Sequence, residues 1–358
     1  MVGGPAKFIK AKPDTPAMPQ EPHTNRHFVL AERPVGEPTD RTLRLESGPI
    51  PKPAAGQMLL RTEFLSLDPY MRGRMSDAKS YAAPVEIGAP ITAETVGEVL
   101  ASNHPDHAVG DLLTAFAGWQ DYFVTDGKGS RKVDPAAAPP STALGVLGMP
   151  GMTAYTGLLN IGQPKAGETV VVAAAAGPVG SLVGQIAKLK GARAVGIAGG
   201  PDKCRYLTEE LGFDAAVDHR GADLPGALAA ACPKGIDVYF ENVGGAVFAA
   251  VMPLLNPFAR IPVCGLVSAY NATEVPPGPD RLPGLMRAVL TNRLHIQGFI
   301  VWDFAAQAET FRKEVGAWIQ EGRVRYREDV VEGLENAPDA FIGLLKGRNF
   351  GKLVVRVA

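Results

Sequence analysis

The segment 173–181, AAAAGPVGS, has small residues at the spacing of a dinucleotide-binding turn, namely Ala175, Gly177 and Gly180. Small residues are needed at these positions because the backbone must turn tightly and approach a pyrophosphate, which then lies at a helix N-terminus. A tight strand-to-helix connection without a ligand can carry the same residues, so the motif alone does not decide between the two. The strand pattern before it and the helix pattern after it favour nucleotide binding.

The residues after the second strand of this unit bear on which nicotinamide nucleotide fits. NAD enzymes usually place a ribose-binding Asp or Glu about 20 residues beyond the turn, whereas this chain reads AGGPDK at 198–203. The glycines leave room, and Lys203 and Arg205 are near enough in sequence to pair with a 2′-phosphate. The alternative is that both cations are solvated on a helix. The missing carboxylate favours NADPH.

Residues with metal-ligand chemistry are few. The three cysteines, Cys204, Cys232 and Cys264, are too far apart for a disulfide framework, a CxxC pair or a cysteine-based zinc site. His104 and His107 are close in sequence, but SNHPDH offers no third ligand at helical or strand spacing. The sequence therefore predicts chemistry without a metal ion, and the cysteine usage favours a reducing compartment.

Two different patterns divide the chain. From His27 to about Thr125 the apolar runs are short, alternating and interrupted by Gly and Pro, which is typical of strands. After the segment 149–155, apolar runs alternate with segments of helical period, which predicts a parallel sheet with crossover helices. TVVVAAA at 169–175 is the first expected strand of that sheet. The pattern continues for about six parallel strands, a doubly wound Rossmann sheet.

The predicted fold class is therefore α/β, with a Rossmann sheet inserted in a mainly β domain. A last helix is predicted after Asp303 as its N-cap, and the chain ends in KLVVRVA, a strand pattern that can return to the first domain. We expect residues 26–149 and 326–358 to form that substrate domain, and residues 150–325 to form the NADPH-binding domain. Residues 1–25, rich in proline, are expected to be a flexible tail.

Length and composition exclude several classes of function. At 358 residues the chain predicts about two domains. Its 36 Lys and Arg balance 37 Asp and Glu, so no long-range positive field attracts nucleic acid or an anionic membrane. No segment approaches the ~18 apolar residues of a membrane span, and the start lacks the apolar region of a signal peptide. We therefore expect a cytoplasmic protein.

A series of motifs in one order, from about His27 to Ala358, resembles a known family. The sequence is similar to the zinc-independent double-bond reductases of the medium-chain dehydrogenase/reductase superfamily, and most of all to the bacterial NADPH-dependent curcumin reductases and the prostaglandin reductases. The resemblance implies a mainly β, GroES-like substrate domain around the Rossmann sheet. The motifs are SLDPYMRGRM (66–75), LGMPGMTAYTGLL (147–159), AAAAGPVGSLVGQIAKLKG (173–191), YFENVGG (239–245), CGLVSAYN (264–271), GFIV (298–301) and GLLKGRNFGKLVV (343–355).

The resemblance also implies that NADPH is the cofactor and which residues contact it. They are the turn residues Gly177, Pro178, Val179 and Gly180; Lys203 at the 2′-phosphate; Asn242; Cys264, Gly265, Leu266, Val267, Ser268 and Tyr270; Phe299, Ile300 and Val301 at the nicotinamide; and Asn349. Two positions depart from the family. His219 stands where prostaglandin reductases have a tyrosine at the adenosine phosphate, and it remains a candidate for that contact. Ala93, in AETVG, replaces the histidine ligand of zinc relatives.

Reduction of an enone needs a hydride donor, a group that polarises the carbonyl and a proton for the α-carbon. A tyrosine hydroxyl suits the second role and also the third, because it stays protonated near pH 7. Tyr70, in DPYMRGRM, and Tyr270, in CGLVSAYN, are the catalytic candidates, and Tyr81 is a third candidate at the substrate. Each of them could instead be a core tyrosine, and Tyr270 could only position the nicotinamide ribose. Met149 adds soft apolar surface for a bulky unsaturated substrate, although such methionines are more often core.

Three functions remain open on the sequence. The first is NADPH-dependent reduction of the α,β double bond of enones and enals, with a small hydrophobic unsaturated carbonyl compound as substrate. The second is NADPH:quinone reduction, and the third is a non-catalytic, NADPH-binding regulatory protein. The apolar segment LHIQGFIV comes last in the predicted sheet, so we expect it at an edge, covered by a second subunit in a homodimer as the resemblance implies.

Overall fold

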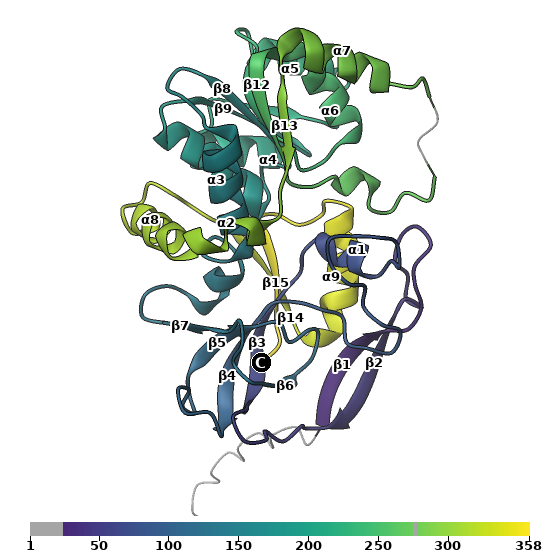
Figure 1. Cartoon of the computed structure of the whole chain (residues 1–358), viewed down its shortest axis with the longest axis vertical. Helices are drawn as coiled ribbons and strands as arrows, with labels where there is room; N and C mark the ends of the chain where they lie inside the picture. Colours follow the sequence, from purple (N-terminus) through teal and green to yellow (C-terminus); the bar gives the residue numbers. More distant parts are fainter. Residues whose placement is uncertain (1–23, 275–277) are drawn as a thin grey trace, which may run out of the picture.

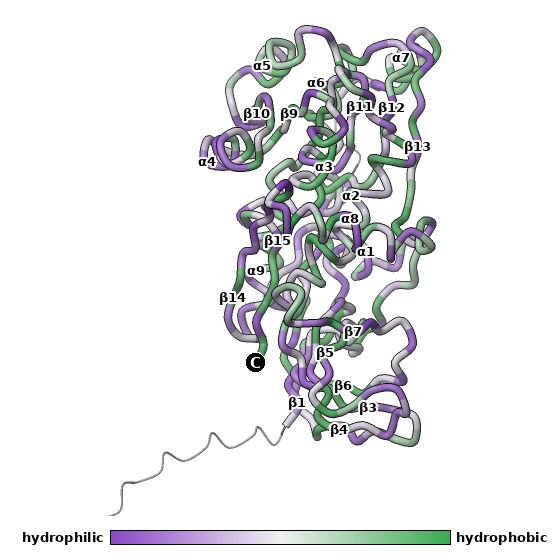
Figure 2. Tube along the Cα trace, turned by 90° about the vertical axis from the view of Figure 1, so that its left-hand side faces the viewer, coloured by the Kyte–Doolittle hydropathy of each residue, from purple (hydrophilic) through white to green (hydrophobic). Residues whose placement is uncertain are grey.

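The computed structural model describes residues 24–274 and 278–358. These residues form two parts that are stacked along the long axis of the molecule (Figure 1, Figure 2). Thr24 and Asn25, predicted to belong to a flexible tail, begin strand β1 (Thr24–Leu30), and the rest of that predicted tail lies outside the described residues.

The first part contains a seven-stranded sheet in the order β14-β15-β3-β4-β5-β7, with β6 paired to β3. Only the β14–β15 pairing is parallel among the described strands of this sheet. Strand β1 pairs with β2 (Leu43–Pro49) in a separate antiparallel hairpin. The seven strands are β3 (Met58–Ser66), β4 (Thr95–Ser102), β5 (Leu112–Ala115), β6 (Tyr122–Thr125), β7 (Arg131–Val133), β14 (Glu328–Glu332) and β15 (Lys352–Arg356).

The C-terminal strand β15 lies beside β3, although the two are far apart in the sequence (Figure 1). They run antiparallel, with Val354 opposite Ser66 and Arg356 opposite Phe64. The KLVVRVA segment therefore returns to the first part of the molecule, as its strand pattern allowed. The domain boundaries 26–149 with 326–358, and 150–325, remain a prediction that this pairing supports.

The second part is a parallel sheet in the order β10-β9-β8-β11-β12-β13, the order of a dinucleotide-binding Rossmann fold. The predicted α/β class and the six parallel strands are confirmed. Its strands are β8 (Thr169–Ala173), β9 (Arg193–Ala198), β10 (Ala215–Asp218), β11 (Ile236–Phe240), β12 (Leu255–Val263) and β13 (His295–Gly298).

Helices cover both faces of this sheet, so its central strands are apolar on both sides. Val170 and Val172 of β8 pack into one cluster with α2, α3 and α8, whereas Val171 packs into the opposite cluster with α5 and α6. This is why TVVVA has no polar face. The α-helices of the described residues are α1 (Tyr70–Arg74), α2 (Met149–Thr156), α3 (Pro178–Leu189), α4 (Pro201–Arg205), α5 (Leu224–Ala231), α6 (Gly245–Val251), α7 (Leu282–Asn292), α8 (Ala308–Gln320) and α9 (Ala337–Leu345).

The predicted start of the last long helix is wrong. A 3-10 turn over Val301–Gln307 follows β13, and α8 begins only at Ala308, after Gln307. The Asp303 carboxylate accepts a hydrogen bond from the backbone N–H of Ile300 at 2.9 Å, within that turn. Asp303 therefore caps a local turn, a role that has the same sequence signature as a helix N-cap.

Aromatic packing fixes the C-terminal segment to the first part. Phe341 of α9 is fully buried and meets the ring of Trp119 edge-on, with ring centroids 5.7 Å apart. Trp119 meets Phe28 of β1 in the same way at 6.2 Å. No helix among the described residues is long and apolar enough to cross a membrane.

Phe341→Ala is expected to lower the free energy of unfolding by about 3 to 5 kcal/mol, because it leaves a cavity beside Trp119. Urea denaturation, followed by tryptophan fluorescence, measures the change. Phe116→Ala is the matched control, since Phe116 is 57% exposed, and it should shift stability by no more than about 0.5 kcal/mol. Equal effects of the two substitutions would contradict the packing described here.

Candidate active site

The predicted dinucleotide turn connects β8 to α3. Gly177 precedes the helix, which begins at Pro178, so the first N–H groups of α3 have no partner within the helix. A side chain at Gly180 would place its Cβ 2.5 Å from the carbonyl oxygen of Ala174, so only glycine allows the turn to close on the helix. Ala174 itself adopts a left-handed conformation, with φ of 51°. The arrangement presents the positive end of α3 to an anion.

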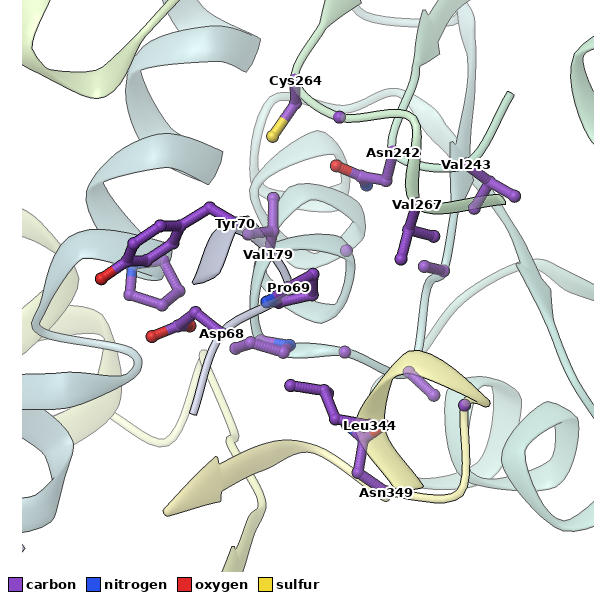
Figure 3. A pocket seen from close by; sticks show the side chains of 18 of the residues that line it. Asp68, Pro69, Tyr70, Val179, Asn242, Val243, Cys264, Val267, Leu344 and Asn349 are labelled. Carbon is purple, nitrogen blue, oxygen red and sulfur yellow. The ribbon is translucent and has the colours of Figure 1, made fainter. Parts of the chain in front are cut away.

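A cavity of about 460 Å³ lies at this turn, between the two parts of the molecule. Figure 3 shows side chains from both parts around it, among them Tyr70, Val179, Asn242 and Leu344. Most of the predicted site residues line the cavity. They are Gly177, Pro178, Val179, Gly180, Lys203, His219, Asn242, Cys264, Gly265, Val267, Tyr270, Phe299, Ile300, Val301, Asn349, Tyr70, Tyr81 and Met149.

Two predicted cofactor residues do not line the cavity. Leu266 is 45% exposed, and the Ser268 hydroxyl donates a hydrogen bond to the carbonyl of Val243 at 2.5 Å. Ser268 therefore holds the loop after β11 through this hydrogen bond. A contact of either side chain with a cofactor remains a prediction.

Basic side chains gather at one end of the cavity. Lys203 donates a hydrogen bond to the Gly347 carbonyl at 2.8 Å, and burial, with the nearby charge of Arg220, lowers its pKa. Partial burial and the Arg220 charge also lower the pKa of His219, so its imidazole is uncharged at neutral pH. An added Cβ at Gly199 would lie 2.8 Å from the His219 ring and 3.0 Å from the Arg220 guanidinium. The glycine thus makes room for both side chains.

Arg220 was missed in the sequence, and Arg205 was predicted in its place. Arg205 forms an ion pair with Asp202 on the exposed side of α4 and does not line the cavity. Arg220 follows His219 directly, after the third strand of the Rossmann sheet. Its position beside the end of the second strand depends on the pairing of β10 with β9, which the sequence does not specify.

A buried carboxylate orders the loop after β11. Glu241 accepts hydrogen bonds from the Tyr239 hydroxyl at 3.0 Å and from the backbone N–H groups of Val243 and Gly244 at 2.6 and 2.8 Å. Burial raises the pKa of Glu241, against these donors, which lower it. Asn242 then donates its side-chain N–H to the Ala173 carbonyl at 2.8 Å, which fixes it beside the dinucleotide turn.

The tyrosines lie toward the other end of the cavity. Burial raises the pKa of Tyr70 and, to a smaller extent, those of Tyr81 and Tyr270. Their hydroxyls are therefore protonated at neutral pH and can donate hydrogen bonds. Tyr81 is 57% exposed, and its ring contacts Trp302 edge-on with centroids 6.2 Å apart. Burial also raises the pKa of the Cys264 thiol to about 12, which makes it a poor nucleophile.

Sequence reasoning missed an ion pair between Lys352 and Asp68, which lies near Tyr70. Lys352 and Asp68 both line the cavity, and their charged atoms are 2.7 Å apart. Figure 3 shows the Asp68 carboxylate and the Tyr70 hydroxyl extending in the same direction. A signal for this pair is present in the sequence: Asp68 in SLDPY and Lys352 in GKLVV are charged residues within apolar motifs. A buried charge needs a partner, so each of them indicated an ion pair.

Metal ligands do not converge in the described residues. No group of three or more His, Cys, Asp or Glu side chains there could hold a metal ion. His104 and His107 have ring centroids 4.9 Å apart, on a loop outside the cavity lining. Activity without a metal remains a prediction.

Comparison with known proteins places this geometry in a family. Residues 26–133 match the family described as N-terminal domain of oxidoreductase, and residues 178–321 match the one described as zinc-binding dehydrogenase. The NADPH-dependent curcumin reductase of Escherichia coli (strain K12) is 59% identical over 95% of this chain and 99% of its own. The chain belongs to the medium-chain dehydrogenase/reductase superfamily.

Two further relatives refine the position within the superfamily. Prostaglandin reductase 1 of Rattus norvegicus is 42% identical over 92% of this chain and 98% of its own. The crystal structure of CurA from Vibrio vulnificus in complex with NADPH superposes with a TM-score of 0.91, at 56% identity, over 93% of this chain and 99% of that one. The medium-chain reductase fold predicted from the motifs is confirmed.

Glu94→Gln is expected to stabilise the protein at alkaline pH. Burial and the charge of Asp68 raise the pKa of Glu94 to about 7, above the unfolded value of about 4.3. The stability that this group contributes is therefore complete below about pH 4 and is lost as the pH rises through 7. Because glutamine does not ionise, the variant should gain about 3 kcal/mol over wild type at pH 8 and little at pH 4.

Urea denaturation of both proteins at several pH values measures this difference. Glu86→Gln is the control, because Glu86 is exposed, and it should change stability by no more than about 0.5 kcal/mol. A Glu94→Gln difference that is constant from pH 4 to pH 8 would contradict the shifted pKa.

Proposed function

We propose that this chain is an NADPH-dependent reductase of the α,β carbon–carbon double bond of enones and enals. The observation that carries the proposal is one cavity with two chemically different ends. At one end are a dinucleotide turn and basic side chains; at the other are tyrosine hydroxyls and apolar side chains. The names of the relatives, a curcumin reductase and a prostaglandin reductase, support the same chemistry.

The residues present fit NADPH. The turn at Gly177–Gly180 would hold the pyrophosphate, and Lys203, Arg220 and His219 would surround the 2′-phosphate, the two cations by charge and the neutral imidazole by hydrogen bonding. Phe299, Ile300 and Val301 would lie at the nicotinamide. When bound, NADPH supplies a hydride, that is, one hydrogen with two electrons.

The chain's own residues would guide the reaction on the substrate. As the β-carbon gains hydride, the π electrons of the double bond move toward the carbonyl and form an enolate. Tyr270 or Tyr70 would donate a hydrogen bond to the enolate oxygen, where negative charge develops. A proton from a tyrosine hydroxyl, replaced from solvent, then completes the α-carbon. Apolar lining residues such as Met149 and Val267 would exclude water from the double bond.

A substrate panel tests the proposal against its alternatives. Purified protein is mixed with NADPH and an enone or a quinone, and separately with NADP⁺ and a saturated alcohol. Oxidation of NADPH, or reduction of NADP⁺ in the alcohol assay, is followed by absorbance. Turnover of enones with the saturated ketone as product supports the proposal. Turnover of quinones alone indicates a quinone reductase, and NADPH binding without turnover of any compound indicates a regulatory protein.

Tyr270→Phe is expected to lower kcat for an enone by about 10²- to 10³-fold, the usual effect of removing one donor to a developing oxyanion. The Kd of NADPH should change far less, because the donor acts on the transition state. Stopped-flow turnover and fluorescence titration measure the two quantities. Equal losses in both would assign Tyr270 to cofactor positioning instead. Tyr70→Phe is tested in the same way. An unchanged kcat would indicate that the Tyr70 hydroxyl has no catalytic role and that the side chain only packs.

Lys203→Ala is expected to weaken NADPH binding roughly 10- to 150-fold, since a hydrogen bond to a charged group contributes about 1.5 to 3 kcal/mol. Binding of NADH, which lacks the 2′-phosphate, should hardly change. Arg220→Ala should show the same asymmetry, and Arg205→Ala, whose cation pairs with Asp202 outside the cavity, is the matched control. Parallel losses for both nucleotides would contradict the assignment.

We also propose a cytoplasmic homodimer. Strand β13 is the last strand of its sheet, and all four of its residues are exposed. Apolar side chains of the adjacent α7, Met286 and Leu290, are 56% and 77% exposed, as an uncovered interface would be. Light scattering at micromolar concentration tests the dimer, and a monomer mass would contradict it. The three unpaired cysteines fit a reducing compartment.

A further inference from the structure

Lys352, the first residue of β15, is a buried lysine whose hydrogen bonds are complete. It is 2% exposed. Its ammonium donates to the Ser66 hydroxyl at 2.7 Å, to the Leu67 carbonyl at 3.0 Å and to one carboxylate oxygen of Asp68 at 2.7 Å. The Ser66 hydroxyl donates to the other carboxylate oxygen. All three N–H groups are therefore directed to one short segment, residues 66–68.

A buried ion pair of this kind adds little net stability, because desolvation of two charges opposes their attraction. Apolar side chains of similar volume could fill the same space. Asp68 is 4% exposed, yet both it and Lys352 reach the cavity surface. The pair instead fixes the orientation of residues 66–68, because three hydrogen bonds from Lys352 hold this segment.

The backbone on either side of the pair connects the two ends of the cavity. The N–H of Gly351 donates to the carbonyl of Ala176, in the dinucleotide turn, at 3.1 Å. Gly351 has φ of +85°, and an added Cβ would lie 2.2 Å from the Arg327 carbonyl, so its position is tightly restricted. Asp68 in turn lies two residues before Tyr70, and its carbonyl accepts the N–H of Met71 in the first turn of α1.

We propose that Lys352 and Asp68 are a positioning pair that sets the distance between the cofactor turn and Tyr70. The main chain before Lys352 is anchored to the turn, and the side chain of Lys352 holds the segment that leads into Tyr70. The inference rests on the proposed function, in that Tyr70 is taken to meet the substrate. Neither Lys352 nor Asp68 is required to contact the reacting atoms.

Other ionisable groups around Lys352 make its charge hard to replace. Besides Asp68, the carboxyl groups of Glu94 and Glu328 are near, and burial raises the pKa of both. Glu328 accepts a hydrogen bond from Ser141 at 2.7 Å through one oxygen, and Arg131 lies near Glu94. Tyr70 faces Asp68 and Glu94. Loss of the ammonium would leave the Asp68 anion facing these groups without its partner.

The test uses Lys352→Met, Asp68→Asn and the double variant, with NADPH and an enone. Each single variant is expected to lower kcat by about 10- to 100-fold, as a misplacement of about 1 Å does, while the Kd of NADPH changes less than threefold. The double variant, which removes both charges of the pair, should recover part of the fold stability and none of the lost kcat. Arg356→Met is the matched control, because Arg356 of the same strand pairs with Glu332 on the surface, and its kcat should equal that of wild type.

A cycle with Tyr70→Phe separates positioning from general packing. If the pair acts through the Tyr70 hydroxyl, Asp68→Asn should lower kcat in the wild-type background and have little further effect in the Tyr70→Phe background. Additive losses, or folded variants with wild-type kcat, would overturn the proposal. Should Lys352→Met fail to fold, Asp68→Asn and the double variant decide by the same criteria.

Failure of the proposed function gives a different result. If wild type reduces no enone, that function is wrong, and the pair is then tested by equilibrium binding of an enone to the complex with NADP⁺. Weaker enone binding in Asp68→Asn than in Arg356→Met, with equal NADP⁺ binding, supports the positioning role. Equal enone binding overturns it.

Discussion

The pairing of β15 with β3 is the interaction on which the cavity depends. It joins residues that are almost 300 positions apart, with Val354 opposite Ser66, and it brings the preceding segment to the carboxyl edge of the Rossmann sheet. Leu344, Gly347, Asn349 and Lys352 then line the cavity. Without this pairing, the side of the dinucleotide turn that now contacts Gly351 would face solvent.

The two ends of the cavity differ in charge, and this difference favours one orientation of cofactor and substrate in the cavity. At Lys203 and Arg220 the cations face one another, and the pKa of Lys203 is lowered by burial and by Arg220, so an anion placed between them relieves the repulsion. At Tyr70 and Tyr270 burial raises the hydroxyl pKa values, which favours neutral donors. A dianionic phosphate is therefore favoured at one end and a neutral carbonyl compound at the other.

Features encoded by local sequence were predictable. The Rossmann strands follow from apolar runs without a polar face, and the turn follows from Gly180, where a Cβ would collide with the Ala174 carbonyl. Most of the site residues predicted from the family motifs do line the cavity. The prediction failed for Leu266 and Ser268, which do not line the cavity. A motif does not say which of its side chains point inward in an irregular loop.

Features that depend on tertiary pairing were not predictable. Arg220, and not Arg205, lies at the basic end because β10 pairs with β9. Arg205 instead forms an ion pair with Asp202, three residues before it. The lysine of GKLVV illustrates the same limit. A charge inside an apolar strand must have a partner, since an unpaired buried ammonium is strongly unfavourable, but the register of β15 against β3 alone decides that this partner is Asp68. Sequence can thus predict that a buried pair exists, whereas its place beside Tyr70 is a property of the fold.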